Sequence, residues 1–431
     1  MTTAPSFSLG SVALPVYLPS LLFAIGEGAV IPVIPVDAAR LGGSLALAGF
    51  ISALIMVGTL IGDIPSGWIV AKVGERNAML GSAVAALAGL LLCIVATVPA
   101  VLGIGVLLVG IATASFALAR QAFMTTFVPR SHRARALSLL GGMFRAGYFV
   151  GPFLAAAVIG LTGSTRSVFI IHAVACVVVA IVLLVLPDPS AVLASRREEA
   201  VAARASLPQD DTVDSYGVLP QREGLVRTLV RHRGVLARMG TNAAMIGGLR
   251  SSRQIILPLV GVSLAMPESH IALVIGVAGG VDLALFFTSG QIMDRFGRLW
   301  SALPSMIGLG LGHLALALVV WNAVADGSAG RVLWFVAVAI GMSLANGVGS
   351  GILMTFGADL APRHDPAPFL GAYRFTGDAG NAAAPLALSA LTAAASLSFA
   401  SAAIGVVGLL GAGLLARWVP RFIPRTPRAR V

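Results

Sequence analysis

The chain has 431 residues, of which 57% are hydrophobic and only 11% are charged, and its net charge is +11. Soluble proteins carry about 25% charged residues and need polar side chains over their surface, so this composition excludes a soluble globular protein. The positive charge does not indicate a nucleic-acid partner, because the basic residues are confined to particular loops.

Twelve apolar stretches are long enough to cross a bilayer as helices, which takes about 20 residues. The sequence therefore predicts an all-α integral membrane protein with twelve transmembrane helices at 12–36, 44–70, 78–98, 101–127, 136–162, 167–187, 237–263, 269–293, 299–321, 331–357, 367–393 and 396–417. One long polar segment separates the sixth span from the seventh. It divides the chain into an N-terminal six-helix half at 1–187, a cytoplasmic linker at 188–236, a C-terminal six-helix half at 237–417 and a basic cytoplasmic tail at 418–431.

The first span contains a carboxylate and two prolines. Glu27 lies inside the apolar run, and Pro32 and Pro35 interrupt the helix near its end. A carboxylate at membrane depth is costly, and broken backbone is tolerated there only against protein or a wet cavity. Glu27 is either a functional group that lines a cavity, or the partner of an arginine on a kinked packing helix.

Basic residues predict how the chain is oriented in the membrane. One set of loops carries Lys72, Arg76, Arg130, Arg133, Arg135, the linker cluster, Arg295, Arg298, Arg363 and the tail arginines. The opposite loops carry only Arg40, Arg166 and Arg331. By the positive-inside rule the first set is cytoplasmic, which places both termini inside a cell (plasma or inner) membrane.

An internal duplication is visible in two loops. Gly290-Gln-Ile-Met-Asp294-Arg295-Phe-Gly297-Arg298 follows the eighth span, and Gly67-Trp-Ile-Val-Ala71-Lys72-Val-Gly74-Glu75-Arg76 follows the second, at an offset of 223 residues. The same offset moves Pro35 onto Pro258. The glycines permit a tight turn between helices, and Asp294 is expected to cap a neighbouring helix N-terminus.

These motifs resemble the major facilitator superfamily. Gly26 followed by Pro32 and Pro35 is similar to the first-span motif of its twelve-span drug:proton antiporters, and Gly147, Gly151 and Pro152 resemble their antiporter motif. The resemblance implies two pseudo-symmetric six-helix bundles that rock around a midplane site. Ala71 stands where the family loop has Asp, so the second copy of the loop is expected to carry the charge network. Arg120 lies near the cytoplasmic end of span four, and we expect its side chain to snorkel, that is, to extend to the cytoplasmic interface.

Eight charged residues inside the predicted spans are candidates for proton or substrate coupling. They are Glu27, Asp63, Asp282, Asp378, Arg145, Arg250, Arg253 and Arg374. The offset makes Glu27 and Arg250 equivalent, and in the family fold their helices face each other, so we expect both to line the central cavity. The same fold would bring Asp63 toward Arg374 and Asp378, and Arg145 toward Asp282. Each pair is either a coupling group or gate, or a static ion pair that specifies the fold.

The function predicted from these features is secondary active transport, as proton-coupled export (antiport) of a small amphipathic or drug-like molecule by alternating access. One alternative is a proton symporter or facilitator that imports a small anionic metabolite, which Arg250 and Arg253 would suit. Another is a non-transporting membrane sensor or scaffold. The sequence has no phosphate-binding loop and no His/Cys/Asp metal cluster, so we expect no enzyme activity, cofactor or metal. The expected partners are a small-molecule substrate, protons and the lipid bilayer but no nucleic acid, and the functional unit is expected to be a monomer.

Overall fold

The structure is a computed structural model that describes residues 16–128, 130–185, 230–322, 330–362 and 366–423. Every regular element within these residues is a helix. The N-terminal group consists of α1 (Leu18–Val30), α2 (Ile34–Arg40), α3 (Leu45–Val73), α4 (Glu75–Val95), α5 (Pro99–Phe127), α6 (Arg130–Thr162) and α7 (Arg166–Val185). The C-terminal group consists of α10 (Arg233–Val235), the π-helical turn η3 (Leu236–Gly240), α11 (Thr241–Ser263), α12 (Glu268–Phe296), α13 (Leu299–Asn322), α14 (Gly330–Val348), α15 (Ile352–Leu360), α16 (Pro366–Ala394) and α17 (Leu397–Phe422).

Ten helical stretches of the described chain are long and apolar enough to cross a membrane. The two predicted spans outside this set, 237–263 and 367–393, are also helical, as η3 with α11 and as α16. They carry Arg250 with Arg253 and Arg374 with Asp378, respectively. The count of twelve fits the fold and stays a prediction, and most of the predicted linker and the end of the tail lie outside the described residues.

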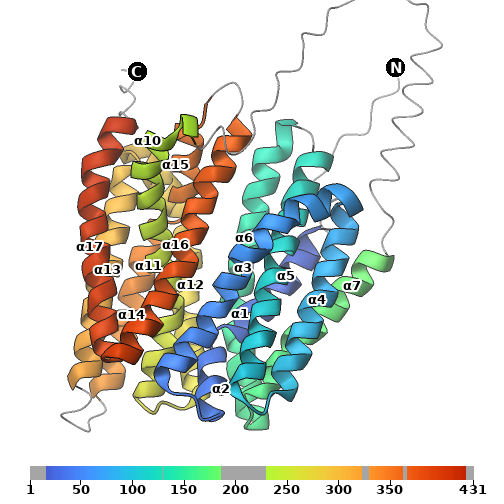
Figure 1. Cartoon of the computed structure of the whole chain (residues 1–431), viewed down its shortest axis with the longest axis vertical. Helices are drawn as coiled ribbons and strands as arrows, with labels where there is room; N and C mark the ends of the chain where they lie inside the picture. The colour runs from blue at the N-terminus through green and yellow to red at the C-terminus, as the bar shows by residue number, and fades with distance from the viewer. Residues whose placement is uncertain (1–15, 129, 186–229, 323–329, 363–365, 424–431) are drawn as a thin grey trace, which may run out of the picture.

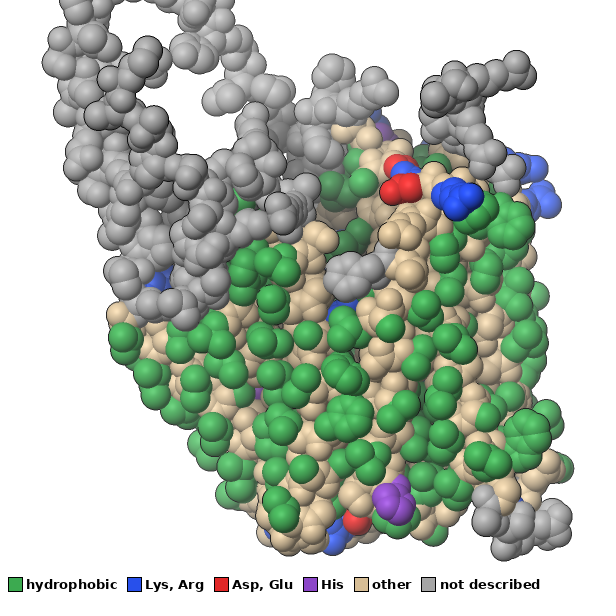
Figure 2. Space-filling model, turned by 180° about the vertical axis from the view of Figure 1, so that it is seen from behind, with side chains coloured by type: hydrophobic (Ala, Val, Ile, Leu, Met, Phe, Trp, Pro, Cys, Tyr) green, Lys and Arg blue, Asp and Glu red, His purple; other side chains and the backbone are tan. Residues whose placement is uncertain are grey.

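Hydrophobic side chains are spread over the whole face shown in Figure 2, and most of the charged side chains visible there lie toward its two ends. Large apolar residues such as Ile64, Leu161 and Met354 are more than 70% exposed on this molecule. Exposed apolar surface on this scale needs a non-aqueous environment, and helices satisfy their own backbone groups in lipid. The chain is therefore a multi-pass membrane protein.

The two groups of helices stand side by side in Figure 1. Contacts between them are made mainly by α3 against α16 and by α6 against α12. These are the pairs that the family resemblance implies, because α3 and α16 contain spans two and eleven while α6 and α12 contain spans five and eight. Each group is also built alike, since α1 packs on α6 in the first and α11 packs on α16 in the second.

The duplicated loop forms the same turn in both groups. Gly74 has φ 82° and ψ 164°, and Gly297 has φ 98° and ψ 162°. This region of backbone conformation is essentially restricted to glycine. The offset of 223 residues found in the sequence is thus confirmed by backbone geometry. Gly67 and Gly290 lie inside α3 and α12 instead, so they take no part in the turn.

Replacing Gly297 by Ala should lower the free energy of unfolding by about 1–3 kcal/mol, because a Cβ is strained at this φ and ψ. Gly290→Ala is the matched control, since a Cβ at Gly290 meets nothing within 4 Å and Ala favours a helix. Thermal unfolding of the purified proteins in one detergent measures the difference. Equal melting temperatures for the two variants would contradict the role of the turn.

Candidate functional site

The first predicted span is interrupted as expected, because α1 ends at Val30 and α2 begins at Ile34. Glu27 lies in the last turn of α1, and only 4% of its surface is exposed. The side chains that interact with its carboxylate are those of Thr113 and Arg120 from α5 and of Tyr148 from α6. All of them belong to the N-terminal group.

The carboxylate of Glu27 keeps unused hydrogen-bonding capacity. Glu27 Oε2 and Arg120 Nη1 are both buried without a hydrogen-bond partner. Buried polar atoms are normally paired, so unpaired atoms at one point call for an explanation. A group that exchanges a proton or contacts a polar ligand fits this arrangement.

The motif glycines explain how Tyr148 reaches Glu27. A Cβ at Gly28 would lie 2.8 Å from the Cα of Tyr148, and a Cβ at Gly151 would lie 2.5 Å from the backbone N of Ala29. Only glycine allows two helices to approach so closely, as small residues do in membrane helix pairs generally. The Gly147–Pro152 segment therefore works here as a packing surface between α6 and α1. Gly26 does the same on the other side of α1, where a Cβ would overlap the ring of His172.

Arg120 does not extend toward the end of its helix, and the expectation that it snorkels is wrong. Its guanidinium lies over the ring of Phe144, 4.3 Å from the ring centroid, and its charge acts on Glu27. Pairing Arg120 with Glu27 is more favourable than exposing the guanidinium to water, because an unpaired carboxylate buried in the membrane would cost several kcal/mol.

Glu27 and Arg250 are not paired, so the sequence offset gave the wrong partner. Arg250 extends from α11 toward the break between α14 and α15 and donates from Nη2 to the carbonyl oxygen of Gly349, at 2.5 Å. Glu27 is buried and Arg250 is partly buried, and each side chain makes its contacts within its own group of helices.

The break in the tenth predicted span accounts for the direction of Arg250. Gly351 has φ 78°, and the helix stops at Val348 and starts again at Ile352. Freed carbonyl oxygens at membrane depth must find donors. Side chains of three neighbouring helices supply them: Ser301 to Val348 at 2.6 Å, Arg250 to Gly349, and Ser289 to Ser350.

A buried ion pair joins α11 to α12 beside this break. Arg253 Nη2 and Asp282 Oδ2 are 2.5 Å apart, with side-chain exposures of 9% and 14%. Arg253 also donates to Ser343, and Asn346 donates to Asp282 at 3.1 Å. Both residues were candidates, but the pair itself was not predicted.

Arg145 approaches the same ion pair from the other group of helices. Its guanidinium lies 4.4 Å from the ring centroid of Phe286 on α12, and its charge interacts with those of Asp282 and Arg253. The expected proximity of Arg145 to Asp282 is found, although Arg253 is the direct partner of that carboxylate. We call Arg145, Arg250 and Arg253 the arginine cluster.

The third set of charges lies where α3 contacts α16. Arg374 is 3.9 Å from Asp63 across the two groups and 3.3 Å from Asp378 within α16. Arg374 also donates to Gln121 of α5, at 3.3 Å. The expected contacts of Asp63 are present, and because the Arg374 side chain is 48% exposed each bond is weak.

The second copy of the duplicated loop holds a network of charges. Arg298 bonds to Asp359 of α15 at 2.9 Å and to Asp294 at 3.3 Å, and the hydrogen bond with Asp359 raises the pKa of the Arg298 guanidinium. Asp294 is 83% exposed and pairs with Arg298 one turn away, so the expected helix cap is wrong. The network links the Gly297 turn to the end of the broken helix.

In the first copy of the loop, the described contacts are different. Lys72 lies over the ring of Trp68, at 4.8 Å from its centroid. Arg76 donates to the carbonyl oxygens of Leu183 and Leu184 at the end of α7. In the second copy, Arg295 similarly lies over Phe296.

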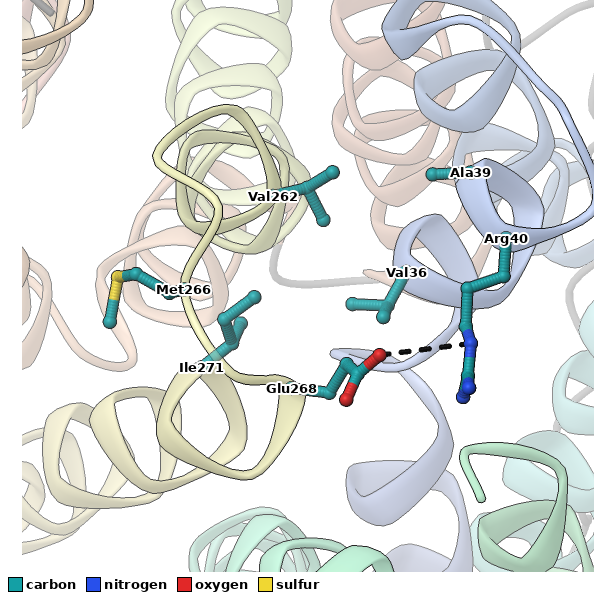
Figure 3. Close-up of a pocket in the computed structure, with 7 residues that line it drawn as sticks. All are labelled: Val36, Ala39, Arg40, Val262, Met266, Glu268 and Ile271. Atoms are coloured by element: carbon teal, nitrogen blue, oxygen red, sulfur yellow. Dashed lines mark ion pairs between the residues drawn. The ribbon is translucent and has the colours of Figure 1, made fainter. Parts of the chain in front are cut away.

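At the opposite end of the molecule a cross-group contact was not predicted. Arg40 of α2 lies 3.7 Å from Glu268 of α12, beside a small pocket between the two groups (Figure 3). Arg40 also donates to Thr165, which donates to the buried Asp37. In the sequence, Arg40 was used only for the orientation of the chain, as one of the few basic residues in the loops opposite the cytoplasmic set.

A comparison with protein families matches the model of the Major Facilitator Superfamily to residues 16–385. The chain belongs to this superfamily. Of the curated relatives, "Probable inositol transporter 3" of Arabidopsis thaliana is 22% identical over 302 residues, 64% of this chain and 51% of the relative. An uncharacterized MFS-type transporter of Mycobacterium tuberculosis is 26% identical over 134 residues, 31% of this chain and 19% of the relative. The chain thus spans about half the length of the first relative and a fifth of the second.

Two solved structures show the same fold. A POT family transporter crystallised with 5-aminolevulinic acid superposes with a TM-score of 0.73 at 11% identity, covering 96% of this chain and 97% of that one. A D-xylose-proton symporter superposes with a TM-score of 0.70 at 17% identity, covering 97% and 99%. These likenesses show the fold, and the family assignment rests on the match over residues 16–385.

Thr113, Tyr148 and Ser343 are site residues that the sequence reasoning passed over. Each is a polar residue inside an otherwise apolar span, which was the available signal. Tyr148 lies within the Gly147–Pro152 motif, in which only the glycines and the proline were predicted to be functional.

Asp282→Asn should destabilise the protein by about 3–5 kcal/mol, because it removes the carboxylate that the three arginines share. Arg253→Gln should cost less, since the charges of Arg145 and Arg250 still act on Asp282. Denaturation of the purified variants in mixed micelles measures both effects. Asp294→Asn, at a largely exposed carboxylate, is the control and should change stability by less than about 0.5 kcal/mol. Equal losses in Asp282→Asn and Arg253→Gln would show that the cluster does not share Asp282.

Proposed function

We propose that the chain is a proton-coupled secondary transporter in which Glu27 binds the proton. The observation that carries this proposal is the environment of Glu27, a buried carboxylate with one arginine, two hydroxyl groups and an unpaired oxygen. Intramembrane carboxylates of this kind mark ion pathways. The motifs around Gly26 and Gly147 favour antiport, with export of a small amphipathic or drug-like molecule.

Alternating access requires contacts between the halves that form at one end while they break at the other. The Arg40–Glu268 and Asp63–Arg374 pairs suit that requirement, because partly exposed ion pairs contribute about 0–1 kcal/mol each and break readily. The basic loops put the Gly297 end, with both termini, in the cytoplasm of the cell. Arg40 and Glu268 would then close the extracellular end. Because one chain holds all of these groups, the working unit would be a monomer.

The second candidate is proton symport that imports an anionic metabolite. The observation that favours it is the arginine cluster, which has one carboxylate for three arginines. A non-transporting sensor or scaffold is the weaker proposal, because such a protein has no need of unpaired buried charges.

Transport into proteoliposomes under an imposed pH gradient tests the proposal, with cationic dyes and organic anions as probes. We expect Glu27→Gln to abolish the dependence of transport on the pH gradient, because an amide cannot carry a proton. Glu75→Gln, at the end of α4, is the matched control and should keep it. Movement of the probe against the proton gradient indicates antiport, and movement with it indicates symport. Unchanged proton-driven transport in Glu27→Gln would remove Glu27 from the mechanism.

Linking α2 to α12 at the Arg40 end tests alternating access. In a variant with Arg40→Cys and Glu268→Cys, and with the buried Cys93 and Cys176 replaced by Ala, a cleavable bismaleimide should stop transport. Cleaving the linker should restore it, because the two ends must separate once in each cycle. Each single cysteine variant treated in the same way is the control. Full transport by the linked protein would contradict the model.

A further inference from the structure

We infer that the substrate carries an anionic group and that the arginine cluster binds that group. This inference rests on the proposed function only in requiring that the chain transports a small molecule. It applies to antiport and to symport alike.

The charges in the interior do not balance at the arginine cluster. The charge of Arg120 acts on Glu27, and Arg374 lies between Asp63 and Asp378. Of the described carboxylates, Asp282 is the one whose charge acts on Arg145 and Arg250, and it is bonded directly to Arg253. The cluster therefore has a surplus of two positive charges. A surplus of this kind in a membrane interior is costly and calls for a negatively charged partner.

The arginine cluster also keeps hydrogen-bond donors that have no partner. Arg250 uses Nη2 on Gly349, while its Nε is buried without a partner. Arg253 Nε is unpaired as well. Arg145 contacts the ring of Phe286, and a cation–π contact of this kind does not use a hydrogen bond from an N–H group. Guanidinium groups bind carboxylates and phosphates through two parallel hydrogen bonds, so the free donors match an oxyanion better than an amine or a sugar hydroxyl.

The arginine cluster lies between the two groups of helices. Arg145 belongs to α6 of the N-terminal group, whereas Arg250 and Arg253 belong to α11 of the C-terminal group. A ligand held between them contacts both halves and is released when the halves separate. Asn346 and the α14–α15 break form the adjoining wall, and broken helices line binding sites in other transporter folds.

A charge-selective labelling experiment tests the inference without requiring transport. In a background with Cys93 and Cys176 replaced by Ala, Asn346→Cys places a reporter thiol beside Asp282 and the cluster. Its rates with an anionic (sulfonatoethyl) and a cationic (trimethylammonioethyl) methanethiosulfonate are each divided by the rate with free cysteine. We expect the anionic reagent to be favoured by roughly tenfold or more, from two unit charges at close range. Arg145→Gln in the same background should reduce that preference several-fold.

Two further reporters keep the test decisive. Phe149→Cys, one turn along α6 from Arg145, should give the same preference if Asn346→Cys does not fold. Gln121→Cys, which lies beside Arg374 with its two carboxylates, should favour the cationic reagent. Equal rates, a preference for the cation or no reaction at Asn346 and Phe149 would overturn the inference. Proton-coupled transport of cationic dyes but not of organic anions would also overturn it, while leaving the proposed function intact.

Discussion

The cost of removing an ionised group from water is the constraint on which this structure depends. A charge in the interior of a membrane protein needs a partner, and the partner's position then determines how helices pack. Arg120 turns inward to Glu27 instead of outward to water. Arg253 joins α11 to α12 through Asp282, and Arg374 joins α16 to α3 through Asp63. These pairs lie where the helices must be held in register.

The same constraint separates the two halves chemically. The N-terminal group holds a carboxylate with an arginine and two hydroxyl groups, which suits proton binding. The C-terminal group holds two arginines of the cluster, one of them bonded to the carbonyl oxygen of Gly349 at the break between α14 and α15. Arg145 and Tyr148 are three residues apart on α6, so one helix carries a side chain into each site and connects them. In the proposed mechanism this is the helix through which proton and substrate binding influence each other.

The larger features of the fold could be predicted from the sequence because they follow from hydrophobicity and from a duplication. Apolar runs gave the spans, and the offset between two loops gave the repeat, which the matching backbone angles of Gly74 and Gly297 confirm. The contacts of α3 with α16 and of α6 with α12 followed from the family resemblance. The glycines of the antiporter-like motif were recognised, but their packing role depends on which atoms lie opposite them.

The side-chain pairings could be predicted only in part. The offset makes Glu27 and Arg250 equivalent along the chain, but equivalence does not fix where long side chains point. Arg250 instead donates to the carbonyl oxygen of Gly349 at the helix break. The Gly-Ser-Gly run at this position is a weak sequence signal for a break. Asp294 likewise pairs with Arg298 one turn away and does not cap another helix. Nearby groups of this kind determine which partner a charged side chain contacts. The sequence alone does not show which of the possible partners is closest.

In the proposed mechanism, proton binding at Glu27 drives the opening and closing of the Arg40–Glu268 and Asp63–Arg374 contacts. Distances between spin labels at Leu41→Cys, after α2, and His270→Cys, in α12, test it most directly, because they report whether the Arg40 end is open without any substrate. The account predicts a distance distribution that shifts with pH in the protein with Glu27 and that is independent of pH in Glu27→Gln. A shift of the same size in both proteins would contradict it.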